Sequence, residues 1–328
     1  MQPAPAKPRI VIVTPALAQA NNGNWQTAQR WANFMAEVYD VRLTDQWRDG
    51  DEALMIALHA RRSASSIQAW RAAPSRKPLL LVLTGTDLYR DIQVDATAQQ
   101  SLQMADRLVV LNELGLNPLA PALRARGQVI LQSSSTRRRR VGAASRVRAV
   151  MVGHLREEKS PQTFMQAAVA LARRKDILLD HVGAGLDTEL AAQAQATEKL
   201  NPQYRWLGAL THTATRSRIH GAHVLVHASR MEGGAHVVIE AITSGTAVLA
   251  SKIDGNVGLL GPDYSGYFPW GDSAALVTLL EECRRDKAIL PRLQAQCDAR
   301  AHLFHPQREK QALLALLANL LPLPESLP

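Results

Sequence analysis

The sequence of 328 residues contains two cysteines, Cys283 and Cys297, and no apolar run of about 18 residues. It also lacks a recognisable secretory signal. Such a sequence does not predict a disulfide-bonded secreted domain or a membrane-spanning helix, so we expect a cytoplasmic protein that contacts no membrane. Aromatic residues make up only 5% of the chain, and none lies within its densest basic run. A platform on which nucleic-acid bases could stack is therefore not expected.

Two glycine motifs that bind nucleotides are missing as well. The segment after the first expected strand, residues 16–25, has Gly23 as its only glycine, so it is neither G-x-G-x-x-G nor a P-loop. A nicotinamide or ATP site of the usual kind is therefore not predicted. Gly23 could still let the backbone approach a ligand, with Asn22 and Asn24 beside it, although asparagines next to glycine also form ordinary turns.

Few residues of the sequence have the spacing that metal ligands usually show. Four residues of the second half can be drawn together as a zinc set: Cys283, Cys297, His302 and His305. They contain neither the C-x2-C nor the H-x3-H pair that structural zinc sites favour. The D-x-D sequence of Asp49 and Asp51 lies in a polar stretch that is typical of a turn. We therefore expect no bound metal.

Positive charge is in excess, with 38 lysines and arginines against 29 acidic residues and a formal net charge of +9. The excess favours anionic partners, which could be nucleic acid, a membrane face or phosphorylated small molecules. The densest basic run, residues 136–148, lies where a domain linker is expected, and such runs are usually solvated. A basic nucleic-acid-binding protein is a remote alternative, because no recognition helix is visible.

The chain is too long for one hydrophobic core, so two domains are expected. Short apolar, β-branched runs that are typical of buried parallel strands recur in both halves. They lie at residues 9–16, 53–60, 78–85, 107–112 and 128–133, and again at 148–155, 177–185, 204–210, 224–229 and 247–253. Segments with apolar residues at helical spacing lie between them. This order predicts an α/β protein with two Rossmann-like, doubly wound domains that face each other across a cleft.

We place the two domains at residues 1–140 and 141–302. Residues 303–328 are expected to form a helix and a tail that pack back on the first domain. In doubly wound sheets, ligands bind beyond the carboxyl ends of the strands. The functional residues should therefore follow the expected strands.

Basic and hydroxyl side chains follow two strands of the first domain. His59 and Arg61 come after the second expected strand. The third is followed by Thr84, Thr86, Asp87 and Arg90. Such groups suit an acceptor that is an oxyanion. Asp87 could instead cap the helix that follows it, and both interpretations stay open.

Charged residues also follow two strands of the second domain. His154, Arg156 and Lys159 lie at the entrance to a helix, and a helix N-terminus with two cations is typical of a diphosphate site. Later, "EGGAHVVIE" places Glu232 on a glycine-rich turn and Glu240 about two turns into the next helix. A carboxylate offers acceptors and no donor, so both acids could bind the vicinal hydroxyls of a sugar or a ribose.

The E-x7-E pattern of Glu232 and Glu240 and the G-x-L-x-x-x-K stretch that ends at Lys159 resemble the retaining glycosyltransferases of family 4, which have the GT-B fold. The resemblance covers the second half of the chain best. It implies that Glu232 contacts the hydroxyls of the donor sugar, Glu240 the ribose and Lys159 the diphosphate.

The sequence departs from that family at two places. His154 stands where the family commonly has arginine, and Arg156 could supply the missing charge. In the first half, "NNGN" at residues 21–24 replaces the usual double-glycine loop. The assignment of the diphosphate site therefore depends more on Lys159 and Arg156 than on the family's own arginine.

Four longer segments carry a narrower resemblance. "TPALAQANNGNWQTAQRW", "LHARRSASSI", "LTGTDLYRDI" and "DGNVGLLGPDYSGYFPWGD" are similar to the selenosugar synthases of selenoneine biosynthesis, the SenB group. This resemblance implies transfer of N-acetylglucosamine from UDP-GlcNAc to selenophosphate, with a 1-seleno sugar, UDP and phosphate as products. A family 4 enzyme with another UDP-hexose or a hydroxyl acceptor is the main alternative.

The resemblances assign the acceptor to the first domain and the donor to the second, with a UDP-sugar as donor substrate and no other cofactor. The expected catalytic residues are Glu232, Lys159, Arg156 and His59. The expected donor-binding residues are Glu240, Glu232, Gly233, Gly234, His154, Arg156, Lys159 and Gly23. The expected acceptor-binding residues are Asn22, Asn24, Arg61, Thr84, Thr86, Asp87 and Arg90.

These residue types suit the implied reaction. Fixed cations beside the leaving phosphate stabilise its developing charge, so Lys159 and Arg156 can do the work of a metal. The selenium of selenophosphate is already nucleophilic near neutral pH, so it needs positioning more than a general base. His59 is the candidate for proton transfer if the reaction requires one.

Overall fold

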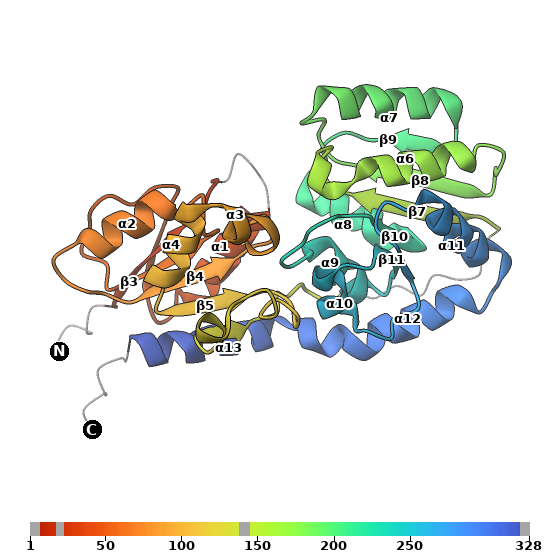
Figure 1. The fold of residues 1–328 in the computed structure, drawn as a ribbon. Helices are drawn as coiled ribbons and strands as arrows, with labels where there is room; N and C mark the ends of the chain where they lie inside the picture. Colours follow the sequence, from red (N-terminus) through yellow and green to blue (C-terminus); the bar gives the residue numbers. More distant parts are fainter. Residues whose placement is uncertain (1–6, 18–22, 138–144, 322–328) are drawn as a thin grey trace. The chain divides into compact units, whose positions relative to one another are not determined.

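The computed structural model describes residues 7–17, 23–137 and 145–321. The chain divides into two compact units, each built on one parallel sheet (Figure 1). Unit 1 comprises Met1–Gln132 and Pro306–Pro328, and unit 2 comprises Ser133–His305. The boundaries lie at residues 132 and 305, where the sequence suggests 140 and 302.

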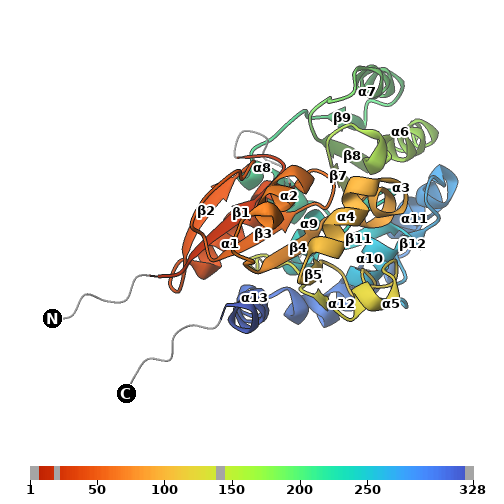
Figure 2. The ribbon, with the colours of Figure 1, turned by 60° about the vertical axis from the view of Figure 1, so that its left-hand side comes forward.

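Unit 1 contains a six-stranded parallel sheet in the order β2-β1-β3-β4-β5-β6, with β2 at one edge (Figure 2). Its strands are β1 (Arg9–Val13), β2 (Asp40–Thr44), β3 (Leu54–Leu58), β4 (Leu79–Leu83), β5 (Arg107–Val110) and β6 (Gly127–Val129). Its helices are α1 (Gly23–Met35), α2 (Ala64–Ala72), α3 (Ile92–Val94), α4 (Ala96–Met104), α5 (Pro121–Arg124) and α13 (Pro306–Leu320). A wide π-helical turn, η2 (Asp87–Asp91), precedes α3.

The sheet of unit 1 is buried on both faces. Successive side chains of a strand point to opposite faces, so the apolar residues of β1 divide between two cores. Val11 and Val13 pack in the core that includes residues of α2 and α4. Ile10 and Ile12 pack in the core that includes residues of α1 and α13. The continuous apolar runs of the sequence therefore correspond to strands covered by helices on both sides.

The last helix, α13, belongs to unit 1 although it follows unit 2 in the sequence. Glu309 of α13 is buried, and its Oε1 accepts a hydrogen bond of 2.8 Å from Nε1 of Trp31 in α1. Its Oε2 lies 2.8 Å from Nε of Arg30. This buried ion pair and the apolar residues of α13 fix the C-terminal helix to α1.

Unit 2 contains a second six-stranded parallel sheet, in the order β12-β11-β10-β7-β8-β9. Its strands are β7 (Val147–Val152), β8 (Ile177–Val182), β9 (Tyr204–Trp206), β10 (Val224–His227), β11 (Ala247–Ser251) and β12 (Tyr267–Phe268). Its helices are α6 (Pro161–Ala170), α7 (Thr188–Leu200), α8 (His212–Gly221), α9 (His236–Ser244), α10 (Asp254–Leu260), α11 (Ser273–Arg285) and α12 (Ile289–Arg300). Two short 3-10 turns, η3 (Glu157–Lys159) and η4 (Ala301–Phe304), complete the unit.

Each sheet has a topological switch point, at which the chain crosses from one side of the first strand of the unit to the other side. In unit 1 this place lies between β1 and β3, and in unit 2 it lies between β7 and β10. Ligands of doubly wound sheets bind at such a crevice, beyond the carboxyl ends of the two strands. The loops that follow β3, β7 and β10 carry His59, Lys159 and Glu232, respectively.

The two-domain α/β architecture is confirmed, and all ten expected strands are present. Two further strands, β2 and β12, are missing from the sequence prediction. β2 is an edge strand with no fully buried residue, and β12 contains only two residues. Neither offers the continuous apolar run from which a buried strand can be recognised.

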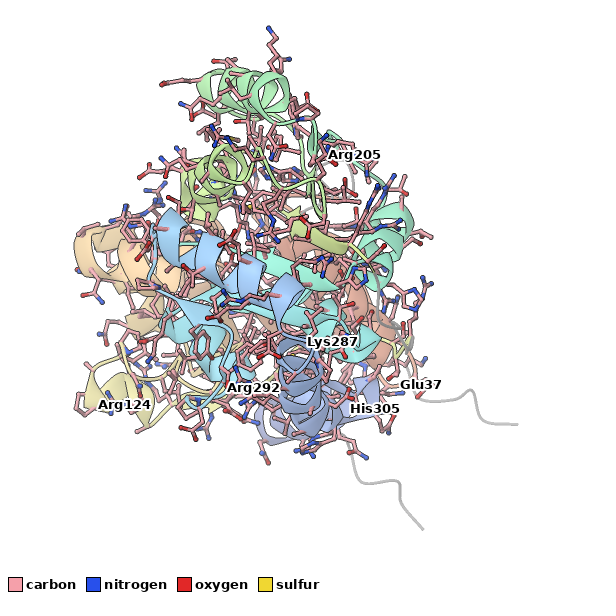
Figure 3. The ribbon with its side chains drawn as sticks, turned by 90° about the vertical axis from the view of Figure 1, so that its right-hand side faces the viewer. Glu37, Arg124, Arg205, Lys287, Arg292 and His305 are labelled. Carbon is pink, nitrogen blue, oxygen red and sulfur yellow. The ribbon has the colours of Figure 1, made fainter. Side chains whose placement is uncertain are left out.

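Charged residues of unit 2 such as Arg205, Lys287 and Arg292 are exposed at its surface (Figure 3). Arg205 on the edge strand β9 forms an ion pair of 2.6 Å with Asp180 of β8. Among the helices within residues 7–17, 23–137 and 145–321, none combines the length and the apolar character that crossing a membrane requires.

Candidate functional site

Glu232 and Lys159 come together in unit 2 although they lie 73 residues apart. Nζ of Lys159 is 2.5 Å from Oε1 of Glu232, and Nε2 of His227 is 3.4 Å from the same oxygen. Burial by itself would raise the pKa of Glu232, but the Lys159 ammonium and His227 outweigh it and hold the pKa far below its usual range. Glu232 is therefore an ionised, buried carboxylate.

The turn that carries Lys159 is held in a strained conformation. Ser160, which follows Lys159, has a φ of +47°, in the left-handed region that favours glycine. Its Oγ accepts a hydrogen bond of 2.8 Å from Nε1 of Trp270. The guanidinium of Arg230 lies 5.1 Å from the centre of the Trp270 ring, and the Arg230 N–H donates to the carbonyl of Glu158. Two distant loops therefore hold the Lys159 turn in place.

Two glycines allow the loops of this site to approach one another. A Cβ atom on Gly183, after β8, would lie 1.9 Å from the carbonyl oxygen of Gly153, after β7. A Cβ atom on Gly255 of α10 would lie 2.0 Å from the carbonyl oxygen of Glu232. Any side chain at either position would push the loops apart, so these glycines are required by close backbone contact.

His154 is positioned as a hydrogen-bond donor. Its Nδ1 accepts a hydrogen bond of 3.0 Å from the backbone N–H of Ala184, so the neutral ring carries its proton on Nε2. Burial lowers the pKa of His154, and the charges of Arg156 and Lys159 lower it further. His154 is thus a neutral donor near neutral pH and does not replace the charge of an arginine.

Arg156 has a polar atom that needs a ligand. Within the part of the chain that the structure describes, its Nε is buried and has no hydrogen-bond partner. A buried guanidinium nitrogen without a partner is unfavourable, and an oxyanion that accepts two N–H groups would satisfy it. Arg156, His154 and Lys159 all lie between β7 and α6.

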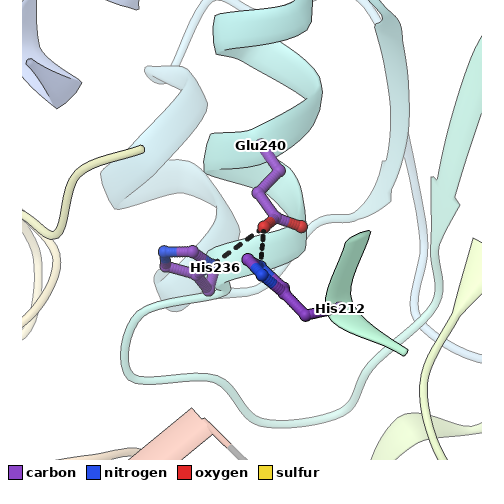
Figure 4. A group of neighbouring side chains, drawn as sticks. All are labelled: His212, His236 and Glu240. Carbon is purple, nitrogen blue, oxygen red and sulfur yellow. Dashed lines mark hydrogen bonds and ion pairs between the residues drawn. The ribbon is translucent and has the colours of Figure 1, made fainter. Parts of the chain in front are cut away.

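Glu240 lies at the centre of a cluster on α8 and α9 (Figure 4). Its Oε1 is 2.7 Å from Nε2 of His212, 3.5 Å from Nδ1 of His236 and 3.6 Å from Nε of Arg216. Burial would raise the pKa of Glu240, but its contacts with His212 and His236 lower it to about 2. Of these four residues, only Glu240 is expected from the sequence.

The partners of Glu240 are themselves held by the segment that opens unit 2. Arg216 donates to the side chain and the carbonyl of Ser135, at 2.8 and 2.7 Å. Nε2 of His236 lies 3.1 Å from the carbonyl oxygen of Ser133. The orientation of the Glu240 carboxylate therefore depends on Arg216 and His236, whose side chains are held by Ser135 and Ser133, respectively.

A second cluster lies in unit 1, where the loops after β3 and β4 meet. His59 has a φ of +74°, which is rare for a residue other than glycine. Its Nε2 is 3.0 Å from Oγ1 of Thr86, and its Nδ1 accepts a hydrogen bond from the Arg62 N–H. Burial lowers the pKa of His59. With both ring nitrogens engaged in a buried position, His59 is better suited to donate a hydrogen bond than to transfer a proton.

Asp91 organises the basic residues of this cluster. It is 2% exposed, and its carboxylate lies 2.9 Å from Nε of Arg90 and 3.6 Å from Nε of Arg61. Both arginine side chains are nearly half exposed. One buried acid thus holds two guanidinium groups that face solvent. Asp91 is not among the residues expected from the sequence, although its position four residues after Asp87 was a signal that could have identified it.

Both carboxylate oxygens of Asp87 accept hydrogen bonds from the protein. Asp87 is fully buried, and its carboxylate accepts hydrogen bonds from the backbone N–H groups of Ala60, Thr84 and Gly85. Asp87 therefore joins the loop after β3 to the loop after β4. Asp87 does not cap the turn that follows it, because all three of these N–H groups precede it in the chain and, among the described residues, no side chain caps η2.

The remaining expected residues are placed as follows. Gly23 and Asn24 form the first turn of α1, and Asn22 lies outside the described residues. A Cβ atom on Gly23 would meet nothing within 4 Å, so no contact requires glycine there. Gly233 and Gly234 lie in the turn between β10 and α9. Cys283 and Cys297 are buried and free.

Comparison with known proteins agrees with this architecture. Residues 135–301 match the family model described as glycosyl transferases group 1. Sucrose-phosphate synthase from Thermosynechococcus elongatus has a similar structure, with a TM-score of 0.77 and 16% identity over 96% of this chain and 99% of that chain. HepE from Anabaena, solved in complex with UDP-glucose, has a TM-score of 0.78 and 14% identity over 95% of this chain and 100% of that chain.

TarM from S. aureus, solved with alpha-GlcNAc-glycerol and UDP, is similar over 80% of this chain and 55% of that chain, with a TM-score of 0.63 and 12% identity. No curated protein matches the sequence. At these identities the structural likeness concerns the fold, which is GT-B. The family match covers more than half of the chain, and the chain therefore belongs to the group 1 glycosyl transferases.

Proposed function

We propose that the protein transfers N-acetylglucosamine from UDP-GlcNAc to selenophosphate. The bond between the anomeric carbon and the β-phosphate oxygen breaks, UDP leaves, and a bond forms between that carbon and selenium. Water then cleaves the selenium–phosphorus bond, which gives the 1-seleno sugar and phosphate. The observation that carries the proposal is the partly buried Lys159–Glu232 ion pair, together with Arg156 on the same loop, whose buried Nε lacks a partner within the described residues.

In this proposal, unit 2 binds the donor. Glu240 accepts hydrogen bonds from the ribose hydroxyls and Glu232 from hydroxyls of the sugar, while Gly233 and Gly234 let the backbone come close to the donor. Lys159 and Arg156 bind the diphosphate, and the neutral His154 donates one hydrogen bond to it. A diphosphate that forms an ion pair with Lys159 would break the Lys159–Glu232 contact. The Glu232 carboxylate could then accept hydrogen bonds from the sugar hydroxyls. Because these cations are fixed before the reaction, they stabilise the charge that develops on departing UDP.

Unit 1 binds the acceptor in the same proposal. Arg61 and Arg90, held by Asp91, supply two guanidinium groups for the oxygens of selenophosphate. Thr84, Thr86 and Asn24 supply further polar groups, and Asp87 holds the loops in place. Selenium in this anion is a strong nucleophile without a general base, so the acceptor needs orientation more than activation. A buried, neutral His59 agrees with that requirement.

Two further findings bear on the donor and the acceptor. The four segments that resemble selenosugar synthases include the loops after β1, β3 and β4 and the segment around Trp270, which favours selenophosphate over a hydroxyl acceptor. HepE, by contrast, was solved with UDP-glucose, and its fold resembles this one. Transfer of glucose from UDP-glucose is therefore the second candidate.

The test measures UDP release from UDP-GlcNAc and from UDP-glucose, each with selenophosphate, with glycerol as a hydroxyl acceptor, or with neither. We expect release with UDP-GlcNAc and selenophosphate, and selenium NMR should show carbon-bound selenium in the product. Glu232→Gln should abolish release, whereas Glu189→Gln, an exposed position on α7, should not change it. Release that requires glycerol and ignores selenophosphate would refute the acceptor assignment.

A further inference from the structure

His212, His236 and Glu240 place three metal-ligating atoms close together. One nitrogen from each histidine and one oxygen of the carboxylate lie within 4.8 Å of one another (Figure 4). We propose that these three residues form a binding site for a zinc-type transition-metal ion. The proposed function needs no metal, so this ion is a regulator and not a cofactor.

The hydrogen bonding of His236 prepares it as a ligand. The carbonyl oxygen of Ser133, 3.1 Å from Nε2, can only accept, so Nε2 carries the ring proton and Nδ1 of the neutral ring has a lone pair. That Nδ1 lies 3.5 Å from Oε1 of Glu240, which is also electron-rich. A cation placed between the two atoms could bind both of them. Histidines that bind metals usually donate their other N–H to a carbonyl or carboxylate in this way.

The ligand set indicates which metals fit. Two imidazoles and one carboxylate suit zinc and its neighbours, whereas calcium and magnesium prefer oxygen ligands alone. His236 and Glu240 lie four residues apart on α9, on one face of the helix, so two ligands sit on a rigid element. The third, His212, has a side chain that is 46% exposed, so an ion can enter from its side.

Two features limit the affinity of this site. Ligands of one tetrahedral zinc ion lie about 3.3 Å apart, so the His212 ring must retreat from its present 2.7 Å separation from Oε1. Nε of Arg216 lies 3.6 Å from the same oxygen, and its positive charge opposes a second cation. We therefore expect binding in the micromolar range, and we expect it to tighten when the charge of Arg216 is removed.

Occupancy of this site would take Glu240 away from a nucleotide. Resting on the proposed role of Glu240 in ribose binding, the inference is that zinc and the donor compete for one carboxylate. Zinc then acts as an inhibitor that is relieved by a chelator.

The first test titrates the chelator-treated, full-length protein with zinc chloride in a calorimeter. We expect one ion per chain in the wild type, and affinity lower by on the order of 10-fold or more in His212→Ala and His236→Ala. Arg216→Gln should bind zinc more tightly. His302→Ala, at an exposed histidine outside the cluster, is the control and should match the wild type. Absence of saturable binding, or equal binding by the wild type and both histidine variants, would overturn the proposal.

The second test repeats a UDP titration with and without saturating zinc. We expect zinc to raise the apparent Kd of UDP in the wild type more than in His236→Ala, and that variant also corrects for zinc bound by UDP itself. An equal effect in both proteins would refute competition at Glu240. If UDP fails to bind even without zinc, the proposed function fails, while the zinc site stands on the first test alone.

Discussion

Replacing Glu240 by glutamine is the most direct test of the donor site. Oε1 of Glu240 is already surrounded by His212, His236 and Arg216, so its interaction with a ribose depends mainly on the second oxygen. Glutamine keeps the shape of the side chain but loses the charge and replaces one acceptor with a donor. In the proposed donor site, the variant therefore loses one or two charge-assisted hydrogen bonds to the ribose. This loss corresponds to about 1 to 3 kcal/mol.

In binding terms, the expected change is a Kd for UDP that is about 5- to 150-fold higher in Glu240→Gln than in the wild type. Isothermal titration calorimetry with UDP measures it, and thermal unfolding shows whether the variant is folded. Glu189→Gln is the matched control, because Glu189 is exposed on α7. A folded Glu240→Gln protein that binds UDP as tightly as the wild type would refute the ribose role of this carboxylate.

Four further predictions follow from the same contacts. Trp270→Ala removes the hydrogen bond to Ser160 and the stacking with Arg230, which together contribute about 1.5 to 2 kcal/mol. We therefore expect kcat, measured in steady-state assays, to fall roughly 10- to 30-fold. Trp270→Phe should cause a smaller fall. Asp91→Asn should raise KM for selenophosphate on the order of 10-fold while the Kd of UDP stays unchanged, and an unchanged KM would contradict the role of Asp91 in holding the acceptor arginines. The pKa of Glu240 is lowered from 4.5 to about 2 in the folded state, so its stabilising effect is complete above pH 4.5 and disappears as pH falls toward 2. Melting temperatures of the wild type and Glu240→Gln should therefore converge over that interval, and a constant gap would argue against the ionised cluster. Activity should survive EDTA, because in the proposed function Lys159 and Arg156 stabilise the diphosphate without a metal. Loss of turnover that Mg²⁺ restores would overturn this mechanism.

Some residues of the candidate site could be recognised from the sequence because their neighbours in the chain reveal them. Glu232 and Glu240 flank a glycine-rich turn and the start of a helix, and Lys159 follows a strand at a helix entrance. These local patterns place a residue at the carboxyl end of a parallel sheet, where ligands bind. The partners of these residues have no such local signal.

Those partners lie far from the site residues in the sequence. Arg216 contacts Glu240 from another helix, and Trp270 supports the Lys159 turn from a loop 110 residues away. Of the residues around Glu240, only His236 had a signal in the sequence, since histidine and glutamate four residues apart share one face of a helix. A pairwise contact between distant segments depends on how the strands are ordered, and no local pattern records that order.

The sequence by itself determined the α/β class, the positions of ten of the strands and the side of the sheets on which the polar residues collect. These features follow from the period of the apolar residues and from the glycines, prolines and polar residues at which helices and strands end. Both are local properties of the sequence. The tertiary structure alone decided that Lys159 neutralises Glu232, that Asp87 serves the backbone, and that two histidines and an arginine surround Glu240. Each of these outcomes depends on burial and on close contact between segments that are far apart in the chain. A charged group that is removed from water must be stabilised by a partner, and the sequence does not show which residue that partner is.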